Sequence, residues 1–272
     1  MDIVARIPPS GSLQSDTTIE QLSIRVAGSA ANCALAAAAT GAAVDVIGQV
    51  AQDAFGDMIM KRLTEAGVGT AFIRHCAEQT GVVISQVRPD GERSFLSYRG
   101  ANAQRYGSLA ASTMTPQDYL CLSGYSLQDA ASAETAWALK SVARQCAFDP
   151  TYFFARDFKK HHEPFVAGIQ LLTPNWEEAQ LMTGRSTPDE CAQALRDLGV
   201  DTVVVKLGAQ GCYVYGEGGG QWVPTTPVTG KVDTTGAGDA FCGTLLAKHL
   251  QGAEIGEAAR SANEAARRIV CS

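Results

Sequence analysis

Short apolar runs alternate with segments of helical spacing along most of the chain. Residues 42–50 and 201–208 contain runs of mainly apolar residues and predict buried strands. Residues 53–68 have apolar side chains four positions apart and end at Gly67, a pattern typical of an amphipathic helix. Strands that alternate with helices favour βα units, so we predict an α/β fold with a mostly parallel central sheet.

Further segments continue this alternation. We expect helices over residues 30–41, 133–146, 175–184, 187–200 and 240–252, and strands over residues 119–125, 147–150 and 168–175. The whole chain, residues 1–272, is predicted to form one domain.

Three regions read instead as short antiparallel strands. Residues 80–100 contain two strand patterns joined by a Pro-Asp-Gly turn, and residues 18–28 alternate in the same way. We expect these to form a small sheet set against the main domain as a lid, with strands over about residues 3–26 and 80–102. A further hairpin is predicted over residues 212–224, with its turn at 216–220.

Charge and cysteine usage exclude several classes of partner. The formal net charge is −6 and basic residues occur at most in pairs, which argues against nucleic acid or an anionic membrane as the main partner. No apolar stretch approaches the roughly 18 residues of a membrane helix. The eight cysteines are scattered singly without a CxxC pair, which favours buried thiols in a reducing cytoplasm over a disulfide framework or a metal site.

The stretch "DTTGAGD", residues 233–239, precedes a predicted helix. The first amides of a helix lack intrahelical partners, and small residues at Gly236, Ala237 and Gly238 let an anion approach them closely. Asp239 has two interpretations: it is the N-cap of the helix, or it accepts the proton of a hydroxyl that attacks a phosphoryl group bound at those amides.

This segment carries a resemblance to a known family. "VDTTGAGDAFCGTLL", residues 232–246, resembles the C-terminal signature of the ribokinase-like, PfkB-type carbohydrate kinases. The resemblance implies a three-layer α/β/α domain with a small lid. It also implies that Asp239 is the catalytic base, that the amides of Gly236 to Asp239 form an anion hole, and that Asp233 and Thr235 belong to a loop for a monovalent cation such as K⁺.

Two central segments fit the same pattern. Asn175 and Glu178 have the spacing of an N-cap and its capping-box partner, and they also resemble the family's NxxE motif, which implies a role in organising Mg²⁺ and phosphate. Residues Lys206, Gly208 and Gly211 resemble the strand and turn that border the nucleotide, although alone they form an ordinary strand and turn.

Near the N-terminus the resemblance implies contacts to a sugar substrate. Residues Gly28, Ser29 and Asn32 match the family's N-terminal signature, although Ala27 stands where the first glycine of a pair is common. Asp2 matches an aspartate that binds substrate hydroxyls, as a carboxylate does well. The lid residues Arg99 and Asn102 are further candidates, with a plain surface charge as the alternative for Arg99.

Both ends of the sequence are short relative to the family pattern. The pattern has a complete first strand before the residue that matches Asp2, and a glycine-containing loop after the segment in which Asn263 would lie near the adenine. We therefore expect a chain extended at both ends to melt higher and bind nucleotide more tightly.

The combined motifs predict a cytoplasmic, ATP- and Mg²⁺-dependent kinase that phosphorylates a primary hydroxyl of a sugar or sugar acid. A nucleoside kinase of the same family is the alternative, although Phe95 and Tyr98 on the lid are expected to serve packing, as alternating strand residues commonly do. A non-catalytic sugar- or nucleotide-binding relative is a further alternative. A nicotinamide-dependent enzyme is excluded by the lack of GxGxxG, and a homodimer through an exposed lid edge remains open.

Overall fold

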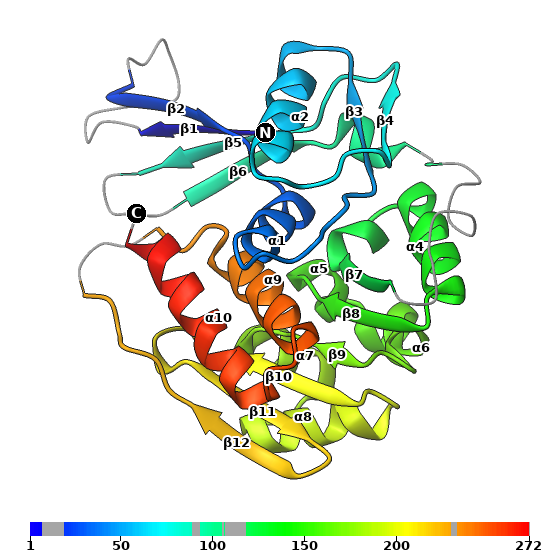
Figure 1. Cartoon of the computed structure of the whole chain (residues 1–272), viewed down its shortest axis with the longest axis vertical. Helices are drawn as coiled ribbons and strands as arrows, with labels where there is room; N and C mark the ends of the chain where they lie inside the picture. The colour runs from blue at the N-terminus through cyan, green and yellow to red at the C-terminus, as the bar shows by residue number, and fades with distance from the viewer. Residues whose placement is uncertain (7–18, 89–92, 105, 107–117, 230–232, 272) are drawn as a thin grey trace.

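The computed structural model describes residues 1–6, 19–88, 93–104, 106, 118–229 and 233–271. Two main sheets divide the protein, a four-stranded sheet and a six-stranded sheet, with helices α1 (Ser29–Ala38) and α9 (Ala237–Leu250) between them (Figure 1). A third, two-stranded sheet pairs β3 (Gly48–Ala51) with β4 (Ile73–Cys76) in parallel.

The six-stranded sheet has the order β12-β11-β10-β9-β8-β7. Its parallel part consists of β7 (Tyr119–Ser123), β8 (Gln145–Asp149), β9 (Leu171–Leu172) and β10 (Thr202–Lys206). Strands β11 (Cys212–Gly216) and β12 (Gly219–Val223) add an antiparallel hairpin at one edge, which confirms the hairpin predicted over residues 212–224.

Two cores cover the two faces of this sheet. On β10, Val203 and Val205 pack into one core while Val204 between them packs into the other, as the two-residue period of a strand requires. The first core includes helices α4 (Ala130–Val142), α7 (Trp176–Thr183) and α8 (Pro188–Asp197), and the second includes α9 and α10 (Ile255–Val270). This arrangement confirms the three-layer α/β/α fold.

Short helices connect the strands on the side of the first core. They are η2 (Gly124–Leu127), α5 (Tyr152–Arg156), the π-helical turn η3 (Phe158–His162), α6 (Glu163–Val166) and η4 (Gly208–Gln210). Buried phenylalanines from β8, α5, η3 and α6 fill this core, with the rings of Phe148 and Phe154 4.7 Å apart in an edge-to-face pair.

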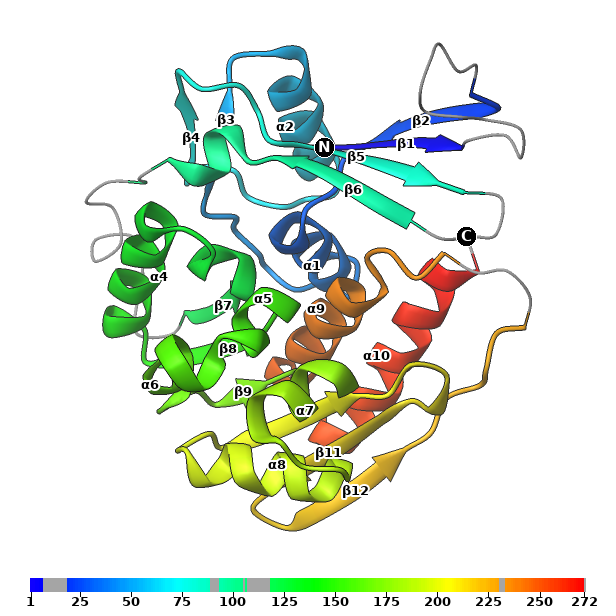
Figure 2. The ribbon, with the colours of Figure 1, turned by 180° about the vertical axis from the view of Figure 1, so that it is seen from behind.

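The small sheet has the order β2-β1-β5-β6. It contains β1 (Asp2–Arg6), β2 (Gln21–Arg25), β5 (Val82–Val87) and β6 (Arg93–Tyr98). The last three lie inside the ranges expected for lid strands, and β1 begins one residue before its range. The Pro-Asp-Gly turn between β5 and β6 lies outside the described residues. Figure 2 shows this sheet from behind, on the opposite side of α1 and α9 from the large sheet.

Two predicted strands are much shorter than expected. Of the strand expected over residues 42–50, only the part in β3 forms a strand. A single bridge from Asp45 to Gly69 precedes it. The strand expected over residues 168–175 reduces to β9 and a single bridge from Asn175 to Lys206, because Pro174 has no amide hydrogen to donate to the ladder and Asn175 caps the next helix. Helix α2 (Ala54–Glu65) and its stop at Gly67, with φ 76°, agree with the sequence pattern.

The closeness of α1 to α9 depends on one small residue. A Cβ at Gly243 of α9 would lie 2.1 Å from the carbonyl oxygen of Cys33 on α1, so this position accepts no side chain without moving a backbone. Helix α1 is thereby fixed against the first turns of α9. Within the described residues, helices of the length and apolar character needed to cross a bilayer are absent.

Candidate active site

The first turn of α9 has the local geometry expected of an anion site. Gly236 is its N-cap and adopts a left-handed conformation with φ 80°, and Ala240 makes the first helical bond back to Gly236. The amides of Gly238 and Asp239 precede that bond and remain at the positive end of the helix dipole. The Ala237 amide, in contrast, donates to the Thr234 carbonyl, so it closes the preceding turn.

Asp239 is not the N-cap, so that interpretation of the sequence is wrong. Its side chain lies on the first turn and accepts hydrogen bonds from Ser29 Oγ at 2.7 Å and from Asn32 Nδ2 at 2.8 Å. Burial raises the pKa of Asp239, and the bonds from Asn32 and Ser29 act in the opposite direction. Two residues expected to contact substrate therefore hold the expected base.

Helix α1 presents these two donors because of how it begins. Its N-cap is Gly28, which has φ 126° and whose carbonyl accepts the Asn32 amide at 2.9 Å. Few side chains adopt such a backbone, so glycine is required here. Ser29 and Asn32 follow three positions apart and share one face of the helix, the face that meets Asp239.

A buried ion pair lies beside the anion site. Lys206, at the end of β10, donates to Asp149 Oδ1 at 2.6 Å, and a Cβ placed on Gly238 would lie 3.5 Å from the Lys206 Nζ. Burial raises the pKa of Asp149, and the Lys206 ammonium opposes that rise. Burial lowers the pKa of Lys206, but the charge of Asp149 raises it, and the net shift is upward. The lysine therefore keeps its proton and brings positive charge to the start of α9.

Asn175 and Glu178 form a complete capping box at the start of α7. Asn175 Oδ1 accepts from the Glu178 amide at 2.9 Å, and Glu178 Oε2 accepts from the Asn175 amide at 2.8 Å. Glu178 is nevertheless only 6% exposed, and burial raises its pKa, with the Lys206 charge opposing. The capping interpretation is confirmed, and the magnesium role stays a prediction.

Asp2 joins this charged group from the small sheet. Burial raises the pKa of Asp2, and the charges of the N-terminal amine and Arg25 lower it. The charges of Asp239 and Asp233 raise it further, so these three carboxylates influence one another electrostatically. Strand register puts Phe95 on the same face of the sheet as Asp2, and its side chain is 55% exposed. Phe95 and Tyr98 are 55% and 47% exposed, so each is partly covered, and the expectation that they serve packing stays a prediction.

Arg99 and Asn102 form a separate cluster at the end of β6. Arg99 donates to Asp129 Oδ2 at 2.8 Å and to Gln128 Oε1 at 2.7 Å, so it tethers the turn η1 (Gly100–Ala103) to the start of α4. Asn102 is exposed on that turn. Arg99 is therefore more than a plain surface charge, and its contact with substrate stays a prediction.

The expected nucleotide residues divide into two kinds. Gly208 has φ 58° with open space where a side chain would lie, which suits close approach of a ligand. Gly211 is needed by the fold, because a Cβ there would lie 2.2 Å from the Val223 carbonyl oxygen. Asn263 is buried and donates to that same oxygen at 3.0 Å, so it ties α10 to the end of β12.

The expected cation loop is closed by contacts of its own. Asp233 Oδ1 accepts the Thr235 amide at 2.9 Å, and Asp233 Oδ2 pairs with Arg25 of β2 at 3.2 Å. The Arg25 guanidinium occupies the outer oxygen of Asp233 in this structure, and the cation role of Asp233 and Thr235 stays a prediction. The pair links the small sheet to the segment before α9.

Two residues of this site escaped the sequence patterns. Asp149 ends β8, and Tyr125 lies in η2 directly after β7. Burial raises the pKa of Tyr125, and the charges of Asp239, Glu178 and Asp149 raise it further. Both follow the carboxyl ends of parallel strands, where ligands of open α/β sheets bind. That rule, applied to residues 119–125 and 147–150, was the available signal.

Comparison with known proteins matches the chain to a family. The model described as pfkB family carbohydrate kinase matches residues 3–272. A 2-dehydro-3-deoxygluconokinase from Thermoproteus tenax is 31% identical over 244 residues, covering 84% of this chain and 74% of that protein.

Solved structures share the fold over the full chain. The ribokinase of Thermotoga maritima has a TM-score of 0.85 at 23% identity, covering 100% of this chain and 90% of that one. A putative ribokinase II from E. coli in complex with ATP and Mg²⁺ has a TM-score of 0.80 at 23% identity, covering 100% and 91%. With the family model spanning nearly every residue, the protein belongs to the pfkB family of carbohydrate kinases and is an ATP-dependent carbohydrate kinase.

Proposed function

We propose that this enzyme transfers the γ-phosphoryl group of ATP to a primary hydroxyl of a sugar or sugar acid, with Asp239 as the general base. The observation that carries the proposal is the position of Asp239: its carboxylate lies in the first turn of α9, beside the amides of Gly238 and itself, and is oriented by Ser29 and Asn32. A base and an anion site that share one helical turn suit in-line attack on a phosphoryl group.

Each charged neighbour has a role in this reaction. The raised pKa of Asp239 makes it a stronger base than an exposed aspartate, which suits removal of a hydroxyl proton near neutral pH. The amides of Gly238 and Asp239, with the Lys206 ammonium beside them, stabilise negative charge on the transferring group. Asp2, on the site face of the small sheet, accepts hydrogen bonds from substrate hydroxyls.

The donor set fits magnesium at Glu178. Glu178 is a buried carboxylate with a raised pKa, and Lys206 is the cation among the described residues whose charge opposes that rise. Mg²⁺ prefers oxygen ligands of this kind and usually keeps several bound waters. Bound there with Asn175 nearby, the ion supplies positive charge that offsets the phosphate oxygens. The K⁺ role of Asp233 and Thr235 stays a prediction, because Arg25 engages the Asp233 side chain.

Relatives support the substrate class. The similar protein from Thermoproteus tenax is named for a sugar acid, and the E. coli structure holds ATP and Mg²⁺. A nucleoside acceptor is the second candidate, favoured by the exposed Phe95 ring on the same face as Asp2, since an aromatic face stacks on bases.

The small sheet also suggests a partner. Ile24, Ile3, Ile84 and Leu96 are paired in register across all four strands and form a row on the face opposite Asp2. Ile24, Ile84 and Leu96 are 46%, 38% and 60% exposed, a contiguous apolar surface of the kind that subunits cover. This outward apolar row fits a second copy of the chain.

A coupled ADP-release assay over sugars, sugar acids and nucleosides tests the reaction. With the best acceptor, Asp239→Asn should lower kcat on the order of 10²- to 10⁴-fold, because the neutral amide cannot take the proton. The matched control is Asp197→Asn, an exposed aspartate at the end of α8, which should leave kcat unchanged. A loss of less than about threefold in Asp239→Asn contradicts the base assignment, and a nucleoside as best acceptor selects the second candidate.

A further inference from the structure

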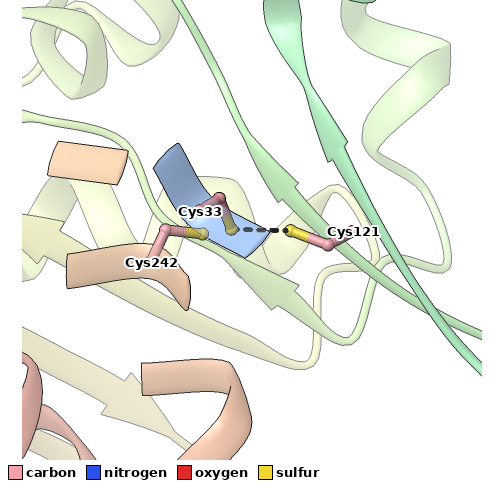
Figure 3. Close-up of side chains that lie close together, drawn as sticks. All are labelled: Cys33, Cys121 and Cys242. Atoms are coloured by element: carbon pink, nitrogen blue, oxygen red, sulfur yellow. Dashed lines mark hydrogen bonds between the residues drawn. The ribbon is translucent and has the colours of Figure 1, made fainter. Parts of the chain in front are cut away.

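Three cysteines from distant parts of the sequence meet behind the active site. Cys33 lies on α1, Cys121 on β7 and Cys242 on α9, and their sulfur atoms all lie within 4.8 Å of one another. Figure 3 shows the three side chains directed toward one another, with Cys33 between the other two and its Sγ 3.8 Å from that of Cys121. Each is a thiol, so no disulfide accounts for the grouping.

The spacing of these sulfurs allows a metal ion, as well as the thiol hydrogen bond between Cys33 and Cys121. A cation bonded to three sulfurs at about 2.3 Å each holds them about 4.0 Å apart when the bonds lie in one plane. The observed 3.8 Å separation and 4.8 Å limit bracket that value, so small side-chain rotations complete the geometry. Within the described part of the chain, no fourth Cys, His, Asp or Glu ligand atom joins the group.

The surroundings distinguish among ions. Three sulfurs without a fourth ligand disfavour Zn²⁺, which is almost always four-coordinate in protein sites, and hard ions such as Mg²⁺ require oxygen. Soft thiolate ligands suit Cu(I) and Zn²⁺ among single metal ions, so with Zn²⁺ disfavoured Cu(I) is the ion that fits best. Thr173 Oγ1 lies 3.5 Å from Cys242 Sγ and supplies the outer hydrogen bond that typically supports a metal ligand.

We propose that Cys33, Cys121 and Cys242 form a binding site for one soft cation of the Cu(I) kind, coordinated by three sulfurs. Binding forms three sulfur–copper bonds and releases the thiol protons to solvent, and no electron is transferred. Cys33 and Cys121 are half-buried as whole residues and Cys242 is buried, so binding requires local opening of the packing around the cluster.

The site is coupled to the catalytic group by its position. Cys33 follows Asn32 directly, and Cys242 lies one helical turn after Asp239, so an ion at the cluster ties together the two helices that orient the base. Gly243 already packs against the Cys33 carbonyl without space to spare, so the side-chain rotations that complete the copper geometry displace α1 or β7 slightly. Occupancy therefore inhibits phosphoryl transfer by moving Ser29 and Asn32 relative to Asp239.

Anaerobic titration of the reduced protein with Cu(I), against a chromogenic Cu(I) chelator, tests the site. A Cys76→Ser/Cys271→Ser background removes a half-buried and an exposed thiol outside the cluster. The expected result is one equivalent of Cu(I) with sulfur-to-copper charge-transfer absorption, weakened on the order of tenfold or more by Cys33→Ala, Cys121→Ala or Cys242→Ala. The matched control, Cys212→Ala, changes a buried cysteine outside the cluster and should bind as the background does.

Circular dichroism establishes that each variant is folded, and three independent variants keep the test valid if one is not. Equal copper binding in all variants overturns the site. A loss of two hydrogens by mass without bound copper also overturns it, because the thiols then form a redox pair.

Kinase assays on the same samples test the coupling, which rests on the proposed function, whereas the binding measurement does not. Full occupancy should slow turnover by about tenfold to a hundredfold, since small misplacements of catalytic groups have effects of that size. An unchanged rate at full occupancy overturns the inhibition. Failure of the proposed reaction itself would appear as absent turnover in the copper-free protein.

Discussion

At the scale of single residues, the site depends on how Asp239 is held. Its carboxylate is partly desolvated, which favours the protonated form, and it accepts two hydrogen bonds, which favour the ionised form. The balance leaves the pKa of Asp239 above that of an exposed aspartate. Ser29 and Asn32 therefore tune the base as well as orient it.

Removing one of these donors should shift the pH profile. Ser29→Ala deletes a bond that lowers the pKa of Asp239, so that pKa rises further. Because the base acts when deprotonated, the acidic limb of kcat/KM should move to higher pH by about one to two units. A bond to a charged group contributes about 1.5–3 kcal/mol, and one pKa unit corresponds to about 1.36 kcal/mol. Ser141→Ala on α4 is the control, and an unmoved limb in Ser29→Ala would show that the serine does not stabilise the carboxylate.

At the scale of elements, the contact between α1 and α9 sets the site. These helices carry the base, its two orienting donors and two of the three clustered cysteines. Their separation is fixed at Gly243, where backbone meets backbone. Any increase in that separation acts directly on Asp239.

Substitution at Gly243 tests this dependence. Gly243→Ala places a Cβ 2.1 Å from the Cys33 oxygen, so the helices separate, and we expect a loss of about 1–3 kcal/mol in unfolding free energy together with a lower kcat. The matched control is Gly256→Ala on α10, which also changes a helical glycine. There the added Cβ would lie 2.9 Å from Gln221 Oε1, the end of a flexible side chain that can move away. Denaturant unfolding and the ADP assay measure both variants, and equal effects at the two positions would contradict the argument.

A substitution at Glu178, at the start of α7, distinguishes a structural role of this carboxylate from a catalytic one. Glu178→Gln keeps an acceptor for the capping box but removes the charge, so stability should change by less than about 1 kcal/mol while the Mg²⁺ concentration for half-maximal rate rises on the order of tenfold. Glu190→Gln on α8 changes the same third helical position away from the site and should leave the Mg²⁺ requirement unaltered. If both variants keep the wild-type requirement, Glu178 serves only as a cap.

At the scale of the whole molecule, two sheets of different character face each other across α1 and α9. The large sheet is covered on both faces, whereas the small sheet leaves an apolar row exposed on its outer side. The Arg25–Asp233 pair connects the small sheet to the segment before α9. Coverage of the outer row by a second copy would bury what a monomer exposes.

Self-association should therefore depend on the outer row. Leu96→Glu places a charge at the β6 end of the row, on its most exposed residue, and should shift the protein from dimer to monomer in sedimentation at micromolar concentration, because burying an unpaired charge is unfavourable. Leu250→Glu is the matched control, an exposed leucine at the end of α9. Monomeric wild-type protein at these concentrations would refute the assembly.

The sequence alone predicted most of the fold and the beginning of α9. Periodicity located the helices, since one apolar face repeats every three to four residues, and glycines such as Gly67 marked their ends. The strands at residues 42–50 and 168–175 were overestimated, because apolar content indicates burial and does not specify pairing. The run at residues 233–239 predicted where α9 begins, because the chemistry of a helix start is local to one helical turn.

Only the tertiary structure decided which residues meet. The N-cap interpretation of Asp239 failed because Gly236 takes that position, and Asp149 was missed because its partner Lys206 is 57 residues away. The cysteines appeared scattered at positions 33, 121 and 242, yet three separate elements bring their sulfurs within 4.8 Å. Local patterns determine elements through backbone geometry, whereas contacts between distant residues arise from packing, which leaves no spacing in the sequence.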